Sequence, residues 1–415
     1  MMDQDGATLR SVAWREVCPW LALFRVFRIA ADVRVLLPAA AGVLLMFGGW
    51  ALLGHAFQPA GWMADNGPGV FDAINASVPD RPGVLVGISG RGLVPHSLDS
   101  GNNPFVGSWS QLTRPLVEVF RPEASPQSVS FAALCGLWAL AVWSLFGAMI
   151  TRVAVVQIAA EERVGLMQAF RFAASKWLSY FLAPVLPLVG ILLCALGVFF
   201  PALLANFDAG LILVGLAWPI ALACGFVMAL LLTGLLFGWP MMASTISAEG
   251  SDTFDALSRS YAYVFQRPMH YLFYASVAAV FGAICWVLVS NFTSGIIAMT
   301  HWAASWAVGW DRMGVLSGSG GSELGEIGRM GVALVSLWVG CLKLIAVGFV
   351  YGYFFAASGC IYLLLRRDVD ATEMDEVYQD ADATEPSYGL PPVPSAESGA
   401  PVVTSDSGED ASQAE

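Results

Sequence analysis

The chain has 415 residues, of which 57% are hydrophobic and 13% are charged, and its mean hydropathy is +0.66. Soluble proteins carry about 25% charged residues, so the composition excludes a set of soluble domains and predicts an all-α integral membrane protein. The net charge of −12 arises at the C-terminal end, where residues 368–415 hold 13 acidic residues and no Lys or Arg. The rest of the chain is therefore close to neutral.

Residues 1–18 form the predicted cytoplasmic N-terminal segment. They do not have the pattern of a cleavable signal peptide, because charged residues are spread through them: Asp3, Asp5, Arg10, Arg15 and Glu16. We expect the first span to act as an uncleaved anchor.

Six apolar segments are long enough to cross a bilayer, which takes about 20 helical residues. They cover about 35–55, 129–150, 180–204, 209–238, 270–292 and 333–365. Lys and Arg flank these spans 13 times on one side and 6 times on the other. Positive residues concentrate on the cytoplasmic side of membrane proteins. We therefore expect both termini of this six-span domain, residues 19–365, to face the cytoplasm.

The first outer loop is expected at about 56–128. Apolar residues recur in it at near-helical spacing, and Pro115 interrupts them: Phe105, Trp109, Leu112, Leu116 and Phe120. This pattern predicts two short helices lying on the membrane.

The second outer loop is expected at about 293–332. It carries Trp302, Trp306 and Trp310, each four residues after the last. Trp is enriched at the membrane interface, which favours a flat interfacial helix here. The alternative is that the fifth span extends through these residues.

Residues 250–268, GSDTFDALSRSYAYVFQRP, have the pattern of an amphipathic helix. Asp252 is a candidate N-cap and Pro268 ends the segment. Its apolar face would carry Phe254, Leu257, Tyr261, Val264 and Phe265. We expect this helix to lie in the cytoplasmic interface with its aromatic side toward lipid.

Two further segments resemble this one. Residues 163–184 have an apolar stripe opposite a polar face, and a stretch near the N-terminus, LALFRVFRIAADVRVLLPA, matches more loosely. The lead-in also recurs, as IAAE at 158–161 and ISAE at 246–249. The pattern predicts three repeated units, each an interfacial helix followed by two spans. The units would cover about 19–150, 151–238 and 250–365.

Basic residues on the three interfacial helices are candidate contacts for anionic lipid headgroups. They are Arg25, Arg28, Arg171, Lys176, Arg259 and Arg267. Each basic residue near an anionic membrane surface is worth about 1 kcal/mol.

Four stretches carry a family resemblance: WREVCPWLALFRVFRIA, TRVAVVQIAAEERVGLMQAFRFAASKWLSYFLAP, GWPMMASTISAEGSDTFDALSRSYAYVFQRP and IYLLLRRDVDATEMDEVY. Together they resemble an uncharacterised multi-pass membrane family common in planctomycete-type bacteria. The resemblance implies a bacterial cytoplasmic-membrane protein. The family has no assigned activity, so it implies no functional residues. The layout is also distantly similar to membrane domains attached to some glycerophosphodiester phosphodiesterases and to Yip-type membrane proteins.

Lys343 lies inside the sixth apolar segment, 23 residues before Arg366. That separation is roughly 35 Å along a helix, which favours a lysine that snorkels to the opposite interface. The alternative places its charge inside the bundle, facing Asp208 or another polar group on a transport path. On the same segment Gly348, Gly352 and Ala356 form a small-residue face, which favours packing inside the fold over dimerisation.

No residue set indicates catalysis, a cofactor or a metal site, and we expect no enzyme activity and no nucleic-acid partner. Residues 366–415 are predicted as an acidic, disordered cytoplasmic tail. The first hypothesis is a non-enzymatic membrane protein that organises lipid, or a protein partner bound through the outer loop or the tail. The alternative is a transporter or channel for a small solute or lipid.

Overall fold

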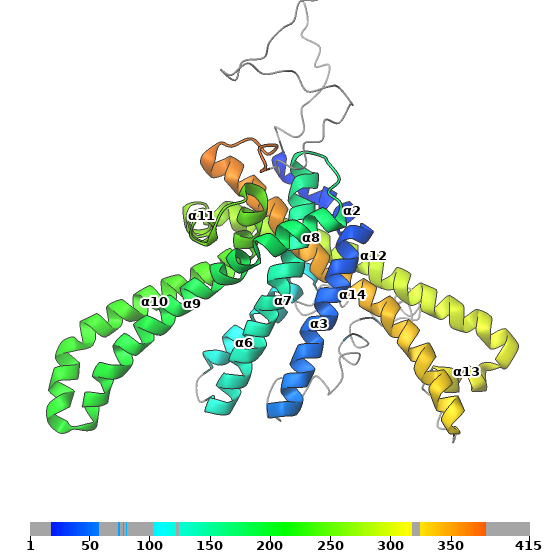
Figure 1. The fold of residues 1–415 in the computed structure, drawn as a ribbon, viewed down its shortest axis with the longest axis horizontal. Helices are drawn as coiled ribbons and strands as arrows, with labels where there is room; N and C mark the ends of the chain where they lie inside the picture. The colour runs from blue at the N-terminus through cyan, green and yellow to red at the C-terminus, as the bar shows by residue number, and fades with distance from the viewer. Residues whose placement is uncertain are drawn as a thin grey trace, which may run out of the picture. The chain divides into compact units, whose positions relative to one another are not determined.

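The computed structural model describes residues 18–57, 74, 78, 80, 103–121, 124–317 and 324–378. The chain divides into one unit up to Val377 and a second from Tyr378 onward, and the description below concerns the first. The regular structure of the described residues is helical. Six helices are long and apolar enough to cross a membrane. They are α3 (Val33–Phe57), α7 (Pro126–Ala159), α9 (Trp177–Ala202), α10 (Asp208–Glu249), α12 (Pro268–Val308) and α14 (Glu326–Asp370) (Figure 1). The six-span, all-α prediction is thus confirmed.

Short helices lie between the long ones. They are η1 (Pro19–Arg25), α2 (Val26–Ala30), α8 (Leu166–Ser175), η3 (Leu203–Asn206), α11 (Thr253–Gln266) and α13 (Trp310–Leu316). α2 precedes α3, α8 joins α7 to α9, and α11 joins α10 to α12. The three therefore share one end of the spanning helices, called here the short-helix end (Figure 1). A short helix precedes two long ones three times, and the repetition of the units stays a prediction.

The second half of α14 forms the centre of the core. Nearly every side chain from Ala346 to Arg366 is buried, which fits a helix that is apolar on all sides. Small residues let α3 come close: a Cβ added at Gly348 would lie 3.0 Å from the Ala40 backbone nitrogen, and one added at Gly352 would lie 2.9 Å from Val35. The small-residue face of α14 thus packs inside the fold.

Helices α9 and α10 pack against each other as a long hairpin (Figure 1), and their apolar side chains are largely exposed. In the most apolar 18-residue stretch of each helix, only 6% of the residues of α9 and 11% of those of α10 are buried in the protein. In a bilayer this surface meets lipid, so burial of apolar area within the protein does not hold the hairpin in place. Its attachment depends on the short-helix end, where α10 contacts α7, α11 and α14.

Between α3 and α7 the described residues include the helix α6 (Pro104–Val119), which continues through Pro115. The prediction of two short helices on the membrane surface is wrong. Asn103 caps the helix by accepting from the backbone N–H groups of Phe105 and Val106.

Polar groups of α6 bond to the backbones of spanning helices. Asn103 donates to the Ala279 carbonyl of α12, the Ser108 hydroxyl donates to the Val350 carbonyl of α14, and the Trp109 indole donates to the Leu236 carbonyl of α10. Each of these carbonyls lies well inside its helix. The helix α6 therefore packs among the spanning helices, because its N-terminal polar groups find partners there.

The fifth spanning helix continues through Trp302 and Trp306 to Val308. The flat interfacial helix favoured for this region is wrong, and the extension of the span is what the structure shows. No Pro occurs between Pro268 and Gly309, which has a positive φ of 76° and ends α12. Trp310 begins α13.

Candidate functional site

The six basic residues singled out as headgroup contacts divide into two groups of three. Arg25, Lys176 and Arg259 bond to other parts of the protein, whereas Arg28, Arg171 and Arg267 are exposed. Among these six, each short-helix region thus has one basic residue that attaches it and one that faces outward. The sequence did not separate these two roles.

The attaching residues each contact a helix terminus. Arg25 pairs with Glu161, just after α7, at 3.2 Å. The Lys176 ammonium donates to the Gly250 carbonyl at the C-terminal end of α10, at 2.7 Å. Arg259 pairs with Glu249, the last residue of α10, at 2.9 Å. These contacts fix the short helices on the ends of the spanning helices.

Beside the exposed arginines lie exposed apolar side chains. Phe24 belongs to η1, Met167 and Phe170 to α8, and Phe254 and Phe265 to α11; all five are more than 40% exposed. In α8 the buried face is Ala169, Phe172 and Ala173, whereas Leu166 and Phe170 point away from the core. A basic residue next to outward apolar side chains is the pattern of a helix in a lipid interface.

Buried Arg152 of α7 supports the same end of α10. Its guanidinium donates to the Ser247 carbonyl at 2.7 Å and lies 4.2 Å from the centre of the Phe172 ring. The Tyr180 hydroxyl lies 2.8 Å from the Ser247 hydroxyl. Cations near the last carbonyls of a helix are stabilised by its dipole. Arg152 and Lys176 thus hold the end of the otherwise uncovered α9–α10 hairpin.

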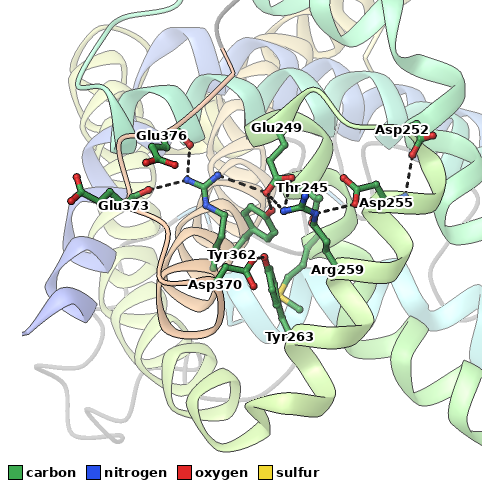
Figure 2. A network of polar contacts seen from close by, with 12 residues as sticks. Thr245, Glu249, Asp252, Asp255, Arg259, Tyr263, Tyr362, Asp370, Glu373 and Glu376 are labelled. Carbon is green, nitrogen blue, oxygen red and sulfur yellow. Dashed lines mark hydrogen bonds and ion pairs between the residues drawn. The ribbon is translucent and has the colours of Figure 1, made fainter.

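Glu249 is the centre of a polar network at the short-helix end (Figure 2). Its carboxylate accepts from Arg259 at 2.9 Å and from the Tyr362 hydroxyl at 2.7 Å, and lies 3.8 Å from the Arg366 guanidinium. Figure 2 shows the Arg259 guanidinium between Glu249 and Asp255, which pairs with it at 3.0 Å. The network joins the C-terminal end of α10 to α11 and to the last turns of α14.

Two groups of α11 have shifted pKa values in this network. Burial disfavours the charged form of Arg259, but its hydrogen bond to Asp255 and the charge of Glu249 outweigh that effect and raise its pKa. Burial, followed by the hydrogen bond to Asp370, raises the pKa of the Tyr263 hydroxyl. Both groups therefore keep their protons throughout the physiological range.

Arg366 holds the segment that follows α14, residues 371–377, called here the strap. Its side chain is 4% exposed, and it donates to the Glu373 and Glu376 carbonyls at 3.1 and 2.6 Å. The strap starts at Ala371, which has a left-handed φ of 54°. Met374 and Val377 of the strap pack against the core. Residues 366–370 extend α14, and 379–415 of the predicted tail lie outside the described residues.

Lys343 is buried in α14, and its ammonium lies 2.6 Å from the carboxylate of Asp80. Asp80 belongs to the loop between α3 and α6, so the described residues supply a partner other than the Asp208 considered from the sequence. The lysine is paired within the protein, which agrees with the internal alternative more than with a side chain that reaches an interface alone.

Glu161 and Glu249 were missed as functional residues. Their signal was present in the recurring lead-ins IAAE and ISAE, which both finish on these glutamates. The lead-ins mark the ends of α7 and α10, where a carboxylate can receive an arginine of a short helix. Within the described residues, no group of three His, Cys, Asp or Glu is arranged to hold a metal ion.

Comparisons of the chain with protein-family models, with curated proteins and with solved structures return no match. The resemblance to the planctomycete-type family therefore stays a prediction. The roles given to residues below rest on their geometry and chemistry alone.

Proposed function

We propose that this multi-pass protein has a non-enzymatic role and gathers anionic lipid at the cytoplasmic face of a bacterial membrane. The observation that carries the proposal is that the basic residues at the short-helix end have two different roles. Of the six basic residues singled out, one in each short-helix region attaches it to the protein, and the other, Arg28, Arg171 or Arg267, is exposed. Exposed apolar side chains of the same regions would insert among the lipids.

The expected strength of this contact follows from the number of exposed arginines. Each is worth about 1 kcal/mol at an anionic surface, so three contribute about 3 kcal/mol together. That corresponds to a preference for anionic over zwitterionic lipid of about 100-fold. The contact is electrostatic and close to water, so added salt should weaken it.

The proposal is tested by the stability of the protein in nanodiscs of two compositions. Wild type should melt at a higher temperature in phosphatidylcholine with phosphatidylglycerol than in phosphatidylcholine alone, because a ligand that binds the folded state stabilises it. The triple variant Arg28→Gln, Arg171→Gln, Arg267→Gln should lose most of this difference. It should not lose the stability that remains in phosphatidylcholine, because these three side chains are exposed.

The matched control removes three exposed arginines from the other ends of the spanning helices: Arg121, Arg312 and Arg329. This control triple should keep the lipid dependence of wild type. An equal loss in both triples would show that only net charge matters and would contradict a site on the short helices. No lipid dependence in wild type would refute the proposal.

A further inference from the structure

The pair formed by Lys343 and Asp80 is unequal in its exposure. The lysine side chain is 4% exposed, whereas the aspartate side chain is 68% exposed. Lys343 lies 17 residues into the 45-residue helix α14, about 25 Å along its axis. A charge within an apolar spanning helix is costly without a partner, and here the partner is mostly exposed while the lysine is buried.

The partner comes from a connecting loop and not from another spanning helix. In the same loop, Ile74 and Val78 are fully buried in the core. They supply apolar packing that holds this part of the loop among the helices independently of the ion pair. The loop thus has a buried apolar attachment and, at Asp80, an exposed carboxylate that neutralises Lys343.

We propose that Lys343 is a binding site for a small carboxylate, open to water on the side of Asp80, and that Asp80 is the carboxylate that occupies it at rest. An exposed carboxylate within the fold has to be reached by water, because an open charge toward lipid would be unfavourable. Water that reaches Asp80 provides a path for a dissolved carboxylate to the same ammonium. The inference goes beyond lipid binding at the short-helix end and does not depend on it.

The chemistry of the ammonium determines the class of ligand. Lys343 offers up to three N–H donors around a compact charge, and its observed partner atom is one carboxylate oxygen, Oδ1 of Asp80. A small monocarboxylate such as formate reproduces that oxygen and that charge. A closed structural pair, with no path from water, would not admit it.

The test replaces Asp80 and supplies the carboxylate from solution. The variant Asp80→Ala, in phosphatidylcholine nanodiscs, is melted in rising sodium formate and, separately, in sodium chloride of equal ionic strength. Formate should raise its melting temperature by several degrees and then saturate, and chloride should do less. Wild type should show no formate-specific rise, because Asp80 already occupies the site.

Two further variants keep the test decisive. The double variant Asp80→Ala, Lys343→Met should show no formate-specific rise, and Asp80→Asn serves in place of Asp80→Ala if the latter does not fold. The inference is overturned if formate and chloride act alike on the single variant, or if the double variant responds to formate as the single variant does. Either result would assign the pair to structure alone.

Discussion

Arg366→Met is expected to release the strap while leaving the spanning helices in place. Methionine keeps an unbranched apolar side chain in the buried position but removes the donor to the Glu373 and Glu376 carbonyls. It also removes the positive charge 3.8 Å from Glu249. That carboxylate retains Arg259 and the Tyr362 hydroxyl, so the network around it should persist.

The size of the effect follows from the two hydrogen bonds. A typical net contribution is about 1 to 1.5 kcal/mol each, so the free energy of opening the strap should fall by about 2 to 3 kcal/mol. This raises the open fraction on the order of 30- to 150-fold. Amide hydrogen exchange of residues 371–377 follows that fraction at those N–H groups that the closed strap protects from water.

The control is Arg171→Met, which removes an exposed positive charge from α8 and leaves Arg366 and both of its carbonyl contacts in place. Exchange in the strap should stay near the wild-type rate in this variant. If Arg366→Met left the strap exchange unchanged, or if both variants increased it equally, the carbonyl contacts of Arg366 would not be what holds the strap.

Three further perturbations test other parts of the structure. The pKa of Asp32 is lowered, mainly by its hydrogen bond with Arg34. This group therefore stabilises the fold above the ordinary carboxyl pKa and loses that effect as the pH falls below about 4. The melting-temperature difference between wild type and Asp32→Asn should shrink from pH 7 to acid, and a constant difference would contradict this. Asp252→Ala removes the N-cap of α11 and should cost about 1 kcal/mol, seen as faster hydrogen exchange in its first turn, whereas unchanged exchange would count against the cap. Gly234→Ala would place a carbon 2.1 Å from the Tyr261 ring and should loosen α11 from α10 by about 1 to 3 kcal/mol; a melting temperature equal to wild type would refute this contact.

The spans and the main amphipathic helix could be predicted from the sequence because their signals are local. Apolar length fixes a spanning helix, and Asp252 and Pro268 mark the start and end of α11 from neighbouring residues. The helix ends were less well predicted: α7 and α10 run beyond the apolar core to Ala159 and Glu249. Their last turns are buried by the short helices, and the mean hydropathy of a segment does not predict such contacts.

The contacts that attach the short helices depend on residues far apart in the chain. Arg25 and Glu161 are separated by 136 residues, and nothing local to either distinguishes Arg25 from the exposed Arg28. The position of α6 has the same cause, since Asn103 and Ser108 bond to α12 and α14, about 180 and 240 residues further on. From the sequence, the polar residues of this Gly- and Pro-rich segment therefore indicated a surface helix. Their hydrogen-bond partners could not be predicted, because those partners lie far away in the chain.

The most direct measurement of the central claim is mass spectrometry of the lipids and proteins that remain with the chain after purification from native membranes in mild detergent. Wild type should retain anionic lipid in excess of its share in the membrane, and the triple variant of Arg28, Arg171 and Arg267 should lose that excess. Retention of a stoichiometric protein partner without lipid enrichment, or lipid enrichment that the triple variant keeps, would contradict an anionic-lipid site on the three short helices.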